Sequence, residues 1–348
     1  MTKIPLVVTG FGHVGRAFLS LLAREKRRPP APLRARTRDP GGGPGGGLLS
    51  LPVRPSTSVT SPAAATSGPP AIRPGGKGSG RRTSSAELGP GGCLVECTLS
   101  DLETGEPGLS YIKAAFRGGW HAVAASKGAL VVGLPELKAL AAENGVFLKF
   151  SGATAAALPT LDVGLFSLAG ARIEGIQGVL NGTSNYILTR MGEGLAYGDA
   201  LKDAQDRGIA EPDPTSDVGG WDTASKILLI TNACLDAGYV LKDVHVRGIV
   251  DLTGEFVRSA RAEGRAVKLL ATAGPGRKGE RWSLDVRPFD PRADPPALPC
   301  RRDREGHHVL HGLHGRRHRD RRPFQPRGAA AALLKDIINI YRHPGAIA

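Results

Sequence analysis

The chain has 348 residues and a formal net charge of +14, with 41% hydrophobic and 22% charged residues. This length gives room for two domains with buried cores, so size does not limit the protein to a small binding module. Residues 26–92 contribute +9 and residues 299–323 contribute +5, so the rest of the chain is neutral and lacks the overall basic character of a nucleic-acid-binding domain.

The N-terminal segment predicts a strand, a tight turn and a helix. Ile4–Val8 is a short β-branched run, Gly10-x-Gly12-x-x-Gly15 follows it, and apolar residues then recur at helical spacing. In such a turn the first glycine permits the bend, the second lets a pyrophosphate approach the backbone amides, and the third lets helix and strand pack closely. The flanking elements favour dinucleotide binding over an ordinary strand-to-helix turn.

The second half of a dinucleotide-binding pattern is missing from the sequence. An acidic residue about 20 residues after the glycines normally binds the ribose, but Asp39 is the only acid nearby and no strand precedes it. The choice between NAD and NADP therefore stays open. Residues 28–92 are rich in proline and glycine. This stretch and the second basic segment, residues 299–323, have no apolar periodicity, so we expect both to be disordered or poorly packed.

Alternating strands and helices resume after this stretch. Leu94–Thr98 predicts a strand, a second strand begins at His121, and residues 135–145 predict a helix that is followed by another strand. This alternation predicts a parallel sheet with both faces covered. Lys127 follows a predicted strand, where open α/β sheets place ligands, although a solvated loop lysine is the simpler interpretation.

A third helical region begins with a polar turn. The sequence around residue 175 predicts a strand, then a turn at Asn181-Gly182, and then a helix capped by Thr183 or Ser184. The free amides and hydroxyl groups at the start of such a helix would suit a substrate carboxylate.

The segment EPDPTSDVGGWDTASK, residues 211–226, places four carboxylates beside one lysine. It connects a helix that ends at Gly208 to a helix that is predicted from near Asp222 to Gly238. Asp222 and Lys226 are four residues apart, so they share a helical face and can form a pair. A weak surface ion pair is the alternative, but the ILLI run after Lys226 favours burial, which makes the proton affinity of a lysine tunable.

These residues resemble the homoserine dehydrogenases. Residues 204–226 are similar to the signature of that family, and the segments GFGHVG, VECTLS, SKG and NGTSNYIL resemble other family segments in the same order. The resemblance covers roughly residues 3–26, 93–287 and 327–341. It implies an α/β fold, with an N-terminal Rossmann-like dinucleotide-binding domain and an α+β catalytic and dimerisation domain. It also implies interconversion of L-homoserine and L-aspartate 4-semialdehyde with NADP or NAD, in threonine and methionine biosynthesis.

The resemblance assigns roles to individual residues. Lys226 would move the hydroxyl proton, with Lys127 as the rival for this task, and Asp222 would position the reactive end of the substrate. The substrate would also be bound by Glu211, Asp217, Gly182 and Thr183. The cofactor would contact Gly10, Phe11, Gly12, His13, Val14, Gly15, Thr98, Lys127, Gly208 and Gly328. A monovalent cation would be held at Ser151, Thr154, Ala156 and Leu158, although Ser151 replaces an acid that the family often has there.

The resemblance and the composition together predict five segments. Residues 1–150 would bind the nucleotide, with 28–92 aberrant; residues 151–290 would form the catalytic and substrate domain; residues 291–326 would be an aberrant basic segment; and residues 327–348 would hold a C-terminal helix that returns to the nucleotide-binding domain. We hypothesise that both aberrant segments are out-of-frame translations of GC-rich coding sequence. Resequencing the gene tests this hypothesis.

Other features predict where the protein works and which partners it has. Four cysteines (Cys93, Cys97, Cys234, Cys300) form no disulfide framework, and no apolar run reaches the ~20 residues of a membrane span. The N-terminus also lacks the apolar core of a signal peptide. We therefore expect a cytoplasmic protein with no membrane partner, and the resemblance implies a homodimer.

Two alternatives stay open for the function. Another amino-acid dehydrogenase on the same scaffold is the first. The second is a nucleic-acid-binding protein that uses the Arg-rich segments, which lack the interleaved aromatic residues of such proteins. Five histidines between residues 307 and 318 have no cysteine pairs or acids in a metal-site pattern, so we expect no metal there.

Overall fold

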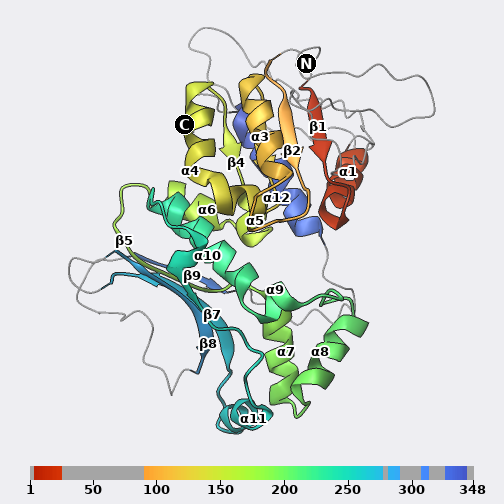
Figure 1. Cartoon of the computed structure of the whole chain (residues 1–348), viewed down its shortest axis with the longest axis vertical. Coiled ribbons are helices and arrows are strands. Elements are labelled where there is room, and N and C mark those ends of the chain that lie inside the picture. The colour runs from red at the N-terminus through yellow and green to blue at the C-terminus, as the bar shows by residue number, and fades with distance from the viewer. Residues whose placement is uncertain (1–3, 26–89, 277–280, 291–306, 313–325, 343–348) are drawn as a thin grey trace, which may run out of the picture. The chain divides into compact units, whose positions relative to one another are not determined.

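The computed structural model describes residues 4–25, 90–276, 281–290, 307–312 and 326–342 (Figure 1). The chain forms two compact units, one of residues 1–157 with 326–348 and the other of residues 158–325. Most of the two segments expected to be aberrant, 28–92 and 291–326, lies outside the described residues.

The first unit is built on a parallel sheet, as the alternation of elements predicts. Its strands lie in the order β1-β2-β3-β4 and all neighbours run parallel. They are β1 (Leu6–Thr9), β2 (Cys93–Glu96), β3 (His121–Ala124) and β4 (Leu148–Lys149). The helices are α1 (His13–Glu25), α3 (Gly108–Arg117), α4 (Gly128–Glu143), α5 (Ser151–Ala155) and α12 (Arg327–Arg342). All four residues of β2 are buried, as expected of a strand that is covered on both faces.

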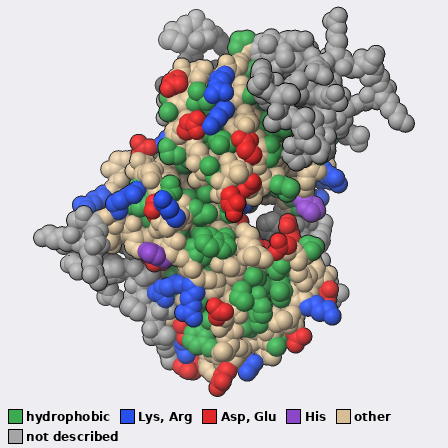
Figure 2. Space-filling view, in the orientation of Figure 1, with side chains coloured by type: hydrophobic (Ala, Val, Ile, Leu, Met, Phe, Trp, Pro, Cys, Tyr) green, Lys and Arg blue, Asp and Glu red, His purple; other side chains and the backbone are tan. Residues whose placement is uncertain are grey.

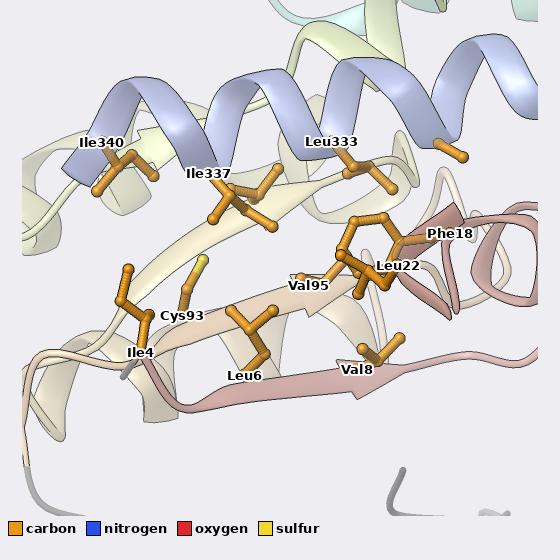
Figure 3. Close-up of a cluster of buried hydrophobic side chains, with 12 residues drawn as sticks. Ile4, Leu6, Val8, Phe18, Leu22, Cys93, Val95, Leu333, Ile337 and Ile340 are labelled. Carbon is orange, nitrogen blue, oxygen red and sulfur yellow. The ribbon is translucent and has the colours of Figure 1, made fainter. Parts of the chain in front are cut away.

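One face of this sheet packs against α1 and α12 (Figure 3). Alternate residues of the strands point into this cluster, and the helices contribute residues spaced by three or four positions. The cluster includes Leu6, Val8, Cys93, Val95, Phe18, Leu22, Leu333, Ile337 and Ile340. Residues from the two ends of the described chain therefore share one core. On the other face Glu96 lies against Gly108 of α3, and α3 packs against α4.

The second unit contains a mixed sheet with the strand order β6-β8-β7-β5-β9. Its strands are β5 (Ile173–Val179), β6 (Val244–Val246), β7 (Lys268–Gly274), β8 (Ser283–Phe289) and β9 (His307–Gly312). The helices are α6 (Thr160–Asp162), α7 (Gly182–Gly192), α8 (Tyr197–Asp206), α9 (Thr215–Val218), α10 (Trp221–Cys234) and α11 (Gly254–Ala262), with single turns η1 (Val163–Ser167) and η2 (Leu241–Asp243). Helix α10 packs against the sheet, and its apolar residues Ile227–Ile230 are buried.

Three predictions about secondary structure are wrong in detail. Residues 307–312 form β9, although the basic stretch 299–323 was expected to be disordered or poorly packed. An edge strand forms by backbone pairing, here in parallel with β5, so it needs no apolar alternation. Helix α10 ends at Cys234 and not at Gly238, and the loop before it contains the short helix α9.

The part of the chain that the structure describes has no helix that is both long and apolar enough to cross a bilayer. On the face shown in Figure 2, acidic and basic side chains are interspersed. This mixed pattern agrees with the neutral charge balance of the chain outside its two basic segments.

Candidate functional site

The glycine turn of the first unit connects β1 to α1, as predicted. Gly10 has a φ of +81°, and a Cβ atom there would lie 2.2 Å from the carbonyl oxygen of Cys97. A Cβ on Gly15 would lie 2.1 Å from the carbonyl oxygen of Gly10. Both positions therefore require glycine, the first for the bend and close approach and the second for close packing.

Gly12 differs from the other two glycines because a Cβ there would meet nothing within 4 Å. The backbone is thus open at the position where the sequence motif expects a pyrophosphate. The amide of Arg16 donates to the carbonyl of Gly12 (3.1 Å), so the helical ladder begins here and the preceding amides belong to the open first turn. This geometry fits an anion at the start of α1. Phe11, His13 and Val14 lie in the same turn.

A buried carboxylate organises the carboxyl ends of β2 and β3. Glu96 is fully buried and accepts hydrogen bonds from the Thr98 amide (2.7 Å), the Thr98 hydroxyl and the Ser126 hydroxyl. The amide of Lys127 donates to the hydroxyl oxygen of Ser100 (2.9 Å), and Lys127 is the N-cap residue of α4. Thr98 and Lys127, both expected to contact the cofactor, are therefore held at one edge of the sheet. Sequence reasoning missed Glu96, whose signal is a charge inside an apolar strand.

The residues expected to bind a cation have other partners. The amide and the hydroxyl of Ser151 donate to the carboxylate of Asp336 (2.9 and 2.8 Å), and the Lys335 ammonium donates to the Ser151 hydroxyl (3.0 Å). The carbonyl of Ser151 accepts from the Thr154 hydroxyl (3.1 Å). Ala156 is the C-cap of α5, and the carbonyl of Leu158 accepts the Thr160 amide (2.9 Å).

An ammonium group beside Ser151 disfavours a second cation at the same place. Among the described residues no group of three or more His, Cys, Asp or Glu side chains is arranged to hold a metal ion. At Ser151 the nearby Lys335 ammonium therefore counts against a monovalent cation.

Gly328 and Gly208, the remaining expected cofactor residues, lie in different units. Gly328 lies in the first turn of α12, where a Cβ would be 3.2 Å from the Cβ of Ala157. Gly208 follows α8 with a φ of +66°, so it ends that helix in a left-handed conformation.

Lys226 and Asp222 form an ion pair in the second unit. The Lys226 Nζ donates to Asp222 Oδ2 (2.6 Å) and to the carbonyl of Leu180 (2.8 Å). Their side chains are only 19% and 12% exposed, so the surface-pair alternative is wrong. The ILLI run that follows is buried against the sheet, which places the start of α10 beside the end of β5.

Asn181 connects this pair to a second carboxylate. Its Nδ2 donates to Asp217 Oδ1 (2.6 Å) and to Asp222 Oδ2 (2.9 Å). Its Oδ1 accepts from the amide of Ser184 (2.8 Å), so Asn181 is the N-cap of α7. The prediction that Thr183 or Ser184 caps this helix is therefore wrong. Asn181 precedes them in a β conformation, the backbone geometry that a capping side chain needs.

The first turn of α7 also holds the loop that carries the carboxylates. The Ser184 hydroxyl donates to the carbonyl of Asp217 (2.7 Å), and the Thr183 hydroxyl donates to the carbonyl of Ile209 (3.1 Å). A Cβ on Gly182 would meet nothing within 4 Å, so the start of α7 is open to a ligand. The structure thus brings Gly182, Thr183, Asp217, Asp222 and Lys226 together.

The side chain of Glu211 is not drawn into this cluster by any contact that the structure describes. The residue is exposed, and it is the carbonyls of Glu211 and Pro212 that accept hydrogen bonds from Gln205 (both 3.2 Å). Asp213 accepts the amide of Thr215 (3.1 Å) ahead of α9. Hydrogen bonds from Thr215 lower the pKa of Asp213 below its ordinary 3.8. Asp213 therefore stabilises the conformation of the loop before α9.

Helix α8, which leads into the loop, is fixed to α7 by a carboxylate. Asp203 accepts from the Tyr186 hydroxyl (2.6 Å), Arg190 Nε (2.9 Å) and Arg207 Nε (2.7 Å). The Tyr186 hydrogen bond and the arginines lower the pKa of Asp203 to about 2. The loop is thus anchored before Gly208 as well as at Asp217.

The cluster at the start of α7 has the chemistry to bind a small amino acid. Ionised carboxylates suit an ammonium group, the amides of a helix N-terminus suit a carboxylate, and a lysine can exchange a proton with a hydroxyl group. The first unit separately presents a glycine turn that fits a dinucleotide. An enzyme that oxidises a hydroxylated amino acid needs both arrangements.

Comparisons with known proteins point to one family. The family model described as homoserine dehydrogenase matches residues 159–338. An NAD(+)-dependent homoserine dehydrogenase from Pseudomonas canavaninivorans is 34% identical over 275 residues, which cover 78% of each chain. A homoserine dehydrogenase from Methanocaldococcus jannaschii is 42% identical over 178 residues, which cover 51% of this chain and 53% of that relative. The match thus spans about half the length of the second relative.

Solved structures extend the similarity over nearly the whole chain. A homoserine dehydrogenase from Thiobacillus denitrificans matches with a TM-score of 0.72 and 25% identity, over 99% of this chain and 75% of that one. A homoserine dehydrogenase from Thermoplasma acidophilum matches with a TM-score of 0.64 over 98% of this chain and 100% of that one. At 17% identity the second likeness concerns the fold alone. The expected fold class, a Rossmann-like unit with an α+β unit, is confirmed.

Proposed function

The chain belongs to the homoserine dehydrogenase family, and from this premise we propose that it oxidises L-homoserine to L-aspartate 4-semialdehyde with NAD or NADP, and catalyses the reverse reaction. This activity would serve threonine and methionine biosynthesis. The observation that carries the proposal is the partly buried Lys226–Asp222 pair, which Asn181 connects to Asp217 at the open start of α7.

The substrate carries an ammonium, a carboxylate and a hydroxyl group, and each has a partner of suitable chemistry in the second unit. Asp217 would bind the ammonium by a charge-assisted hydrogen bond, and Glu211 would join it from the same loop. The amides at Gly182 and Thr183, at the positive end of α7, would bind the carboxylate. Asp222 would hold Lys226 in place and thereby orient the hydroxyl end of the substrate.

Lys226 is our choice for the group that moves the proton. An ammonium has three N–H donors, and two of them are directed to Asp222 and the Leu180 carbonyl. The third can donate to the substrate oxygen. During reduction of the aldehyde the ammonium would give up a proton to the forming alkoxide, and during oxidation the neutral amine would accept it. Lys127 is the rival for this step.

The first unit would hold the cofactor. The amides at Gly10–Gly15 would bind the pyrophosphate, with Thr98, Lys127 and Gly328 as further contacts in the same unit. The resemblance also implies a contact with Gly208, which belongs to the second unit. A nicotinamide bound in the first unit would supply the hydride acceptor for the carbinol carbon. We propose no role for a monovalent cation, since Lys335 already places a positive charge beside Ser151. We also propose a homodimer joined through the catalytic unit, as the resemblance implies, and a cytoplasmic location, which the cysteine usage favours.

The proposal is tested by following nicotinamide reduction by the purified protein with L-homoserine, using NAD and NADP separately. Lys226→Ala should lower kcat by about 100- to 10,000-fold, the usual contribution of general acid–base catalysis. Lys113→Ala is the control, because this lysine pairs with Glu136 at the surface and should leave the rate unchanged. A larger loss in Lys127→Ala than in Lys226→Ala would reverse the assignment of the proton step.

The same preparation tests the remaining parts of the proposal. L-Serine or L-threonine as the better substrate would favour another amino-acid dehydrogenase. A faster rate in sodium or potassium salt than in tetramethylammonium salt would contradict the proposal that no monovalent cation takes part. Light scattering that reports a monomer would contradict the dimer.

A further inference from the structure

We infer that Asn181 is a positioning residue that sets the distance between the two site carboxylates, Asp217 and Asp222. This inference rests on the proposed function, since it concerns how that site is held for its reaction. Asn181 is only 4% exposed, and both heavy atoms of its amide group have partners. It therefore forms a rigid connection among three elements: α7, α9 and α10.

The orientation of the Asn181 amide follows from its hydrogen bonds. The oxygen must be the atom that faces the Ser184 amide (2.8 Å), because a backbone N–H only donates. The NH₂ group then faces the carboxylates of Asp217 (2.6 Å) and Asp222 (2.9 Å), which accept one hydrogen each. The opposite orientation would place two donors together and leave two carboxylates facing an acceptor.

This arrangement solves an electrostatic problem in the second unit. Two carboxylates that meet with no donor between them repel each other and favour sharing a proton. The charged groups placed against the amide are Asp217 of α9, and Asp222 and Lys226 of α10. One neutral group with two N–H donors gives an oxygen of each carboxylate a partner and holds both side chains in fixed places. Asp217 then stays available to an ammonium group while Asp222 holds Lys226.

Two substitutions separate this role from helix capping. Serine is also a good N-cap, so Asn181→Ser should keep a partner for the Ser184 amide while it removes both carboxylate donors. Asn181→Asp should keep the cap too, but it adds a third carboxylate to the cluster. The matched control is Asn232→Asp. Asn232 is equally buried on α10, and it bonds only to the backbone of Tyr239 (2.8 and 2.9 Å) among its described partners.

Homoserine oxidation is measured for each variant from pH 5 to 9, together with thermal unfolding. Asn181→Ser should lower kcat/KM by about 10- to 100-fold, the fold-change that corresponds to losing a hydrogen bond to a charged group. Asn181→Asp should lose more at neutral pH and recover part of the loss as the pH falls, because a proton on the new carboxyl restores one donor. Asn232→Asp should reduce the unfolding temperature without changing the shape of the pH profile.

The outcomes separate the inference from the proposed function. If the wild type is active and the pH profiles of Asn181→Asp and Asn232→Asp have the same shape, the positioning role alone is overturned. Full activity of Asn181→Ser would do the same, and this variant decides the question if Asn181→Asp does not fold. A wild-type protein that does not oxidise homoserine at any pH would overturn the proposed function and, with it, the inference.

Discussion

At the scale of single residues, the glycine turn shows how one motif combines structural and binding demands. Gly10 and Gly15 are fixed by close contacts with the surrounding backbone, whereas Gly12 faces open space. The sequence pattern treats all three glycines alike. Only the surroundings of each residue separate the positions required for folding from the position that is open to a ligand.

This difference leads to a prediction for two alanine variants. Gly10→Ala should lower the free energy of unfolding by more than about 1 kcal/mol, because alanine is strained at a φ of +81° and its Cβ would overlap the Cys97 carbonyl. Gly12→Ala should fold normally but bind NAD or NADP more weakly, because its methyl group occupies the approach to the amides. Urea unfolding and cofactor titration measure the two effects. Equal loss of stability in both variants would contradict the prediction.

Residue-level chemistry could be predicted where it depends on local spacing. Asp222 and Lys226 are four positions apart on one helix, so their pairing could be derived from the sequence. The contacts of Asn181 with Asp217 and Asp222 span 36 and 41 positions and depend on how α7, α9 and α10 pack. Glu96 was missed for a similar reason, because its partner Ser126 lies 30 positions away, in the loop that follows β3.

At the scale of elements, helix α12 completes the core of the first unit (Figure 3). Its residues Leu333, Ile337 and Ile340 pack against strands and a helix that lie more than 200 positions earlier in the sequence. Helical periodicity predicts the helix, and the apolar face predicts that it is buried. Its partners in the core cannot be deduced from periodicity, because any apolar surface would satisfy the same pattern.

The contribution of α12 can be measured with neighbouring isoleucines. Ile337→Ala should cost about 2–5 kcal/mol of unfolding free energy, because the side chain is fully buried and leaves a cavity in the core. Ile338→Ala changes the same residue type one position along the helix, where the side chain is only half-buried, and should cost clearly less. Urea denaturation of both variants checks the order. A larger loss at position 338 would mean that α12 packs through another face.

At the scale of the whole molecule, the strand order bears on the two aberrant segments. Among the described strands, β1 pairs with β2 alone and occupies an edge of its sheet. Residues 26–89 separate α1 from β2 in the sequence, where the typical dinucleotide-binding fold adds strands beyond the first one. The reading-frame hypothesis predicts that a one-base shift in this interval restores strand-like sequence. Resequencing that finds no such frame would refute it.

The two units should respond to acid in different pH ranges. Burial lowers the pKa of His121 below 6.5, and its Nδ1 accepts the Phe147 amide (3.0 Å), so the folded first unit favours the neutral ring. The unfolded chain therefore binds the proton first, and stability should fall as the pH drops below 6.5. Asp336 in the same unit has the opposite sign, since burial raises its pKa and its protonation above pH 3.8 favours the folded form.

In the second unit, the low pKa of Asp203 favours its ionised form in the folded state. Its contribution to stability should be present above pH 3.8 and disappear as the pH falls towards about 2. Hydrogen exchange measured between pH 7 and 4 should show the first unit opening before the second. His121→Gln should shift that opening to a lower pH. His245→Gln, at an exposed position, is the control. Earlier opening of the second unit would contradict this order.

The position of α12 in the chain has a consequence during protein synthesis. A ribosome makes β1 and α1 first, but the helix that covers them emerges only after the entire second unit has been translated. The apolar face of β1 and β2 therefore stays without α12 while more than 200 residues are added. The nascent chain would be a natural client for chaperones during this delay, and premature termination before Arg327 would leave a product marked for proteolysis.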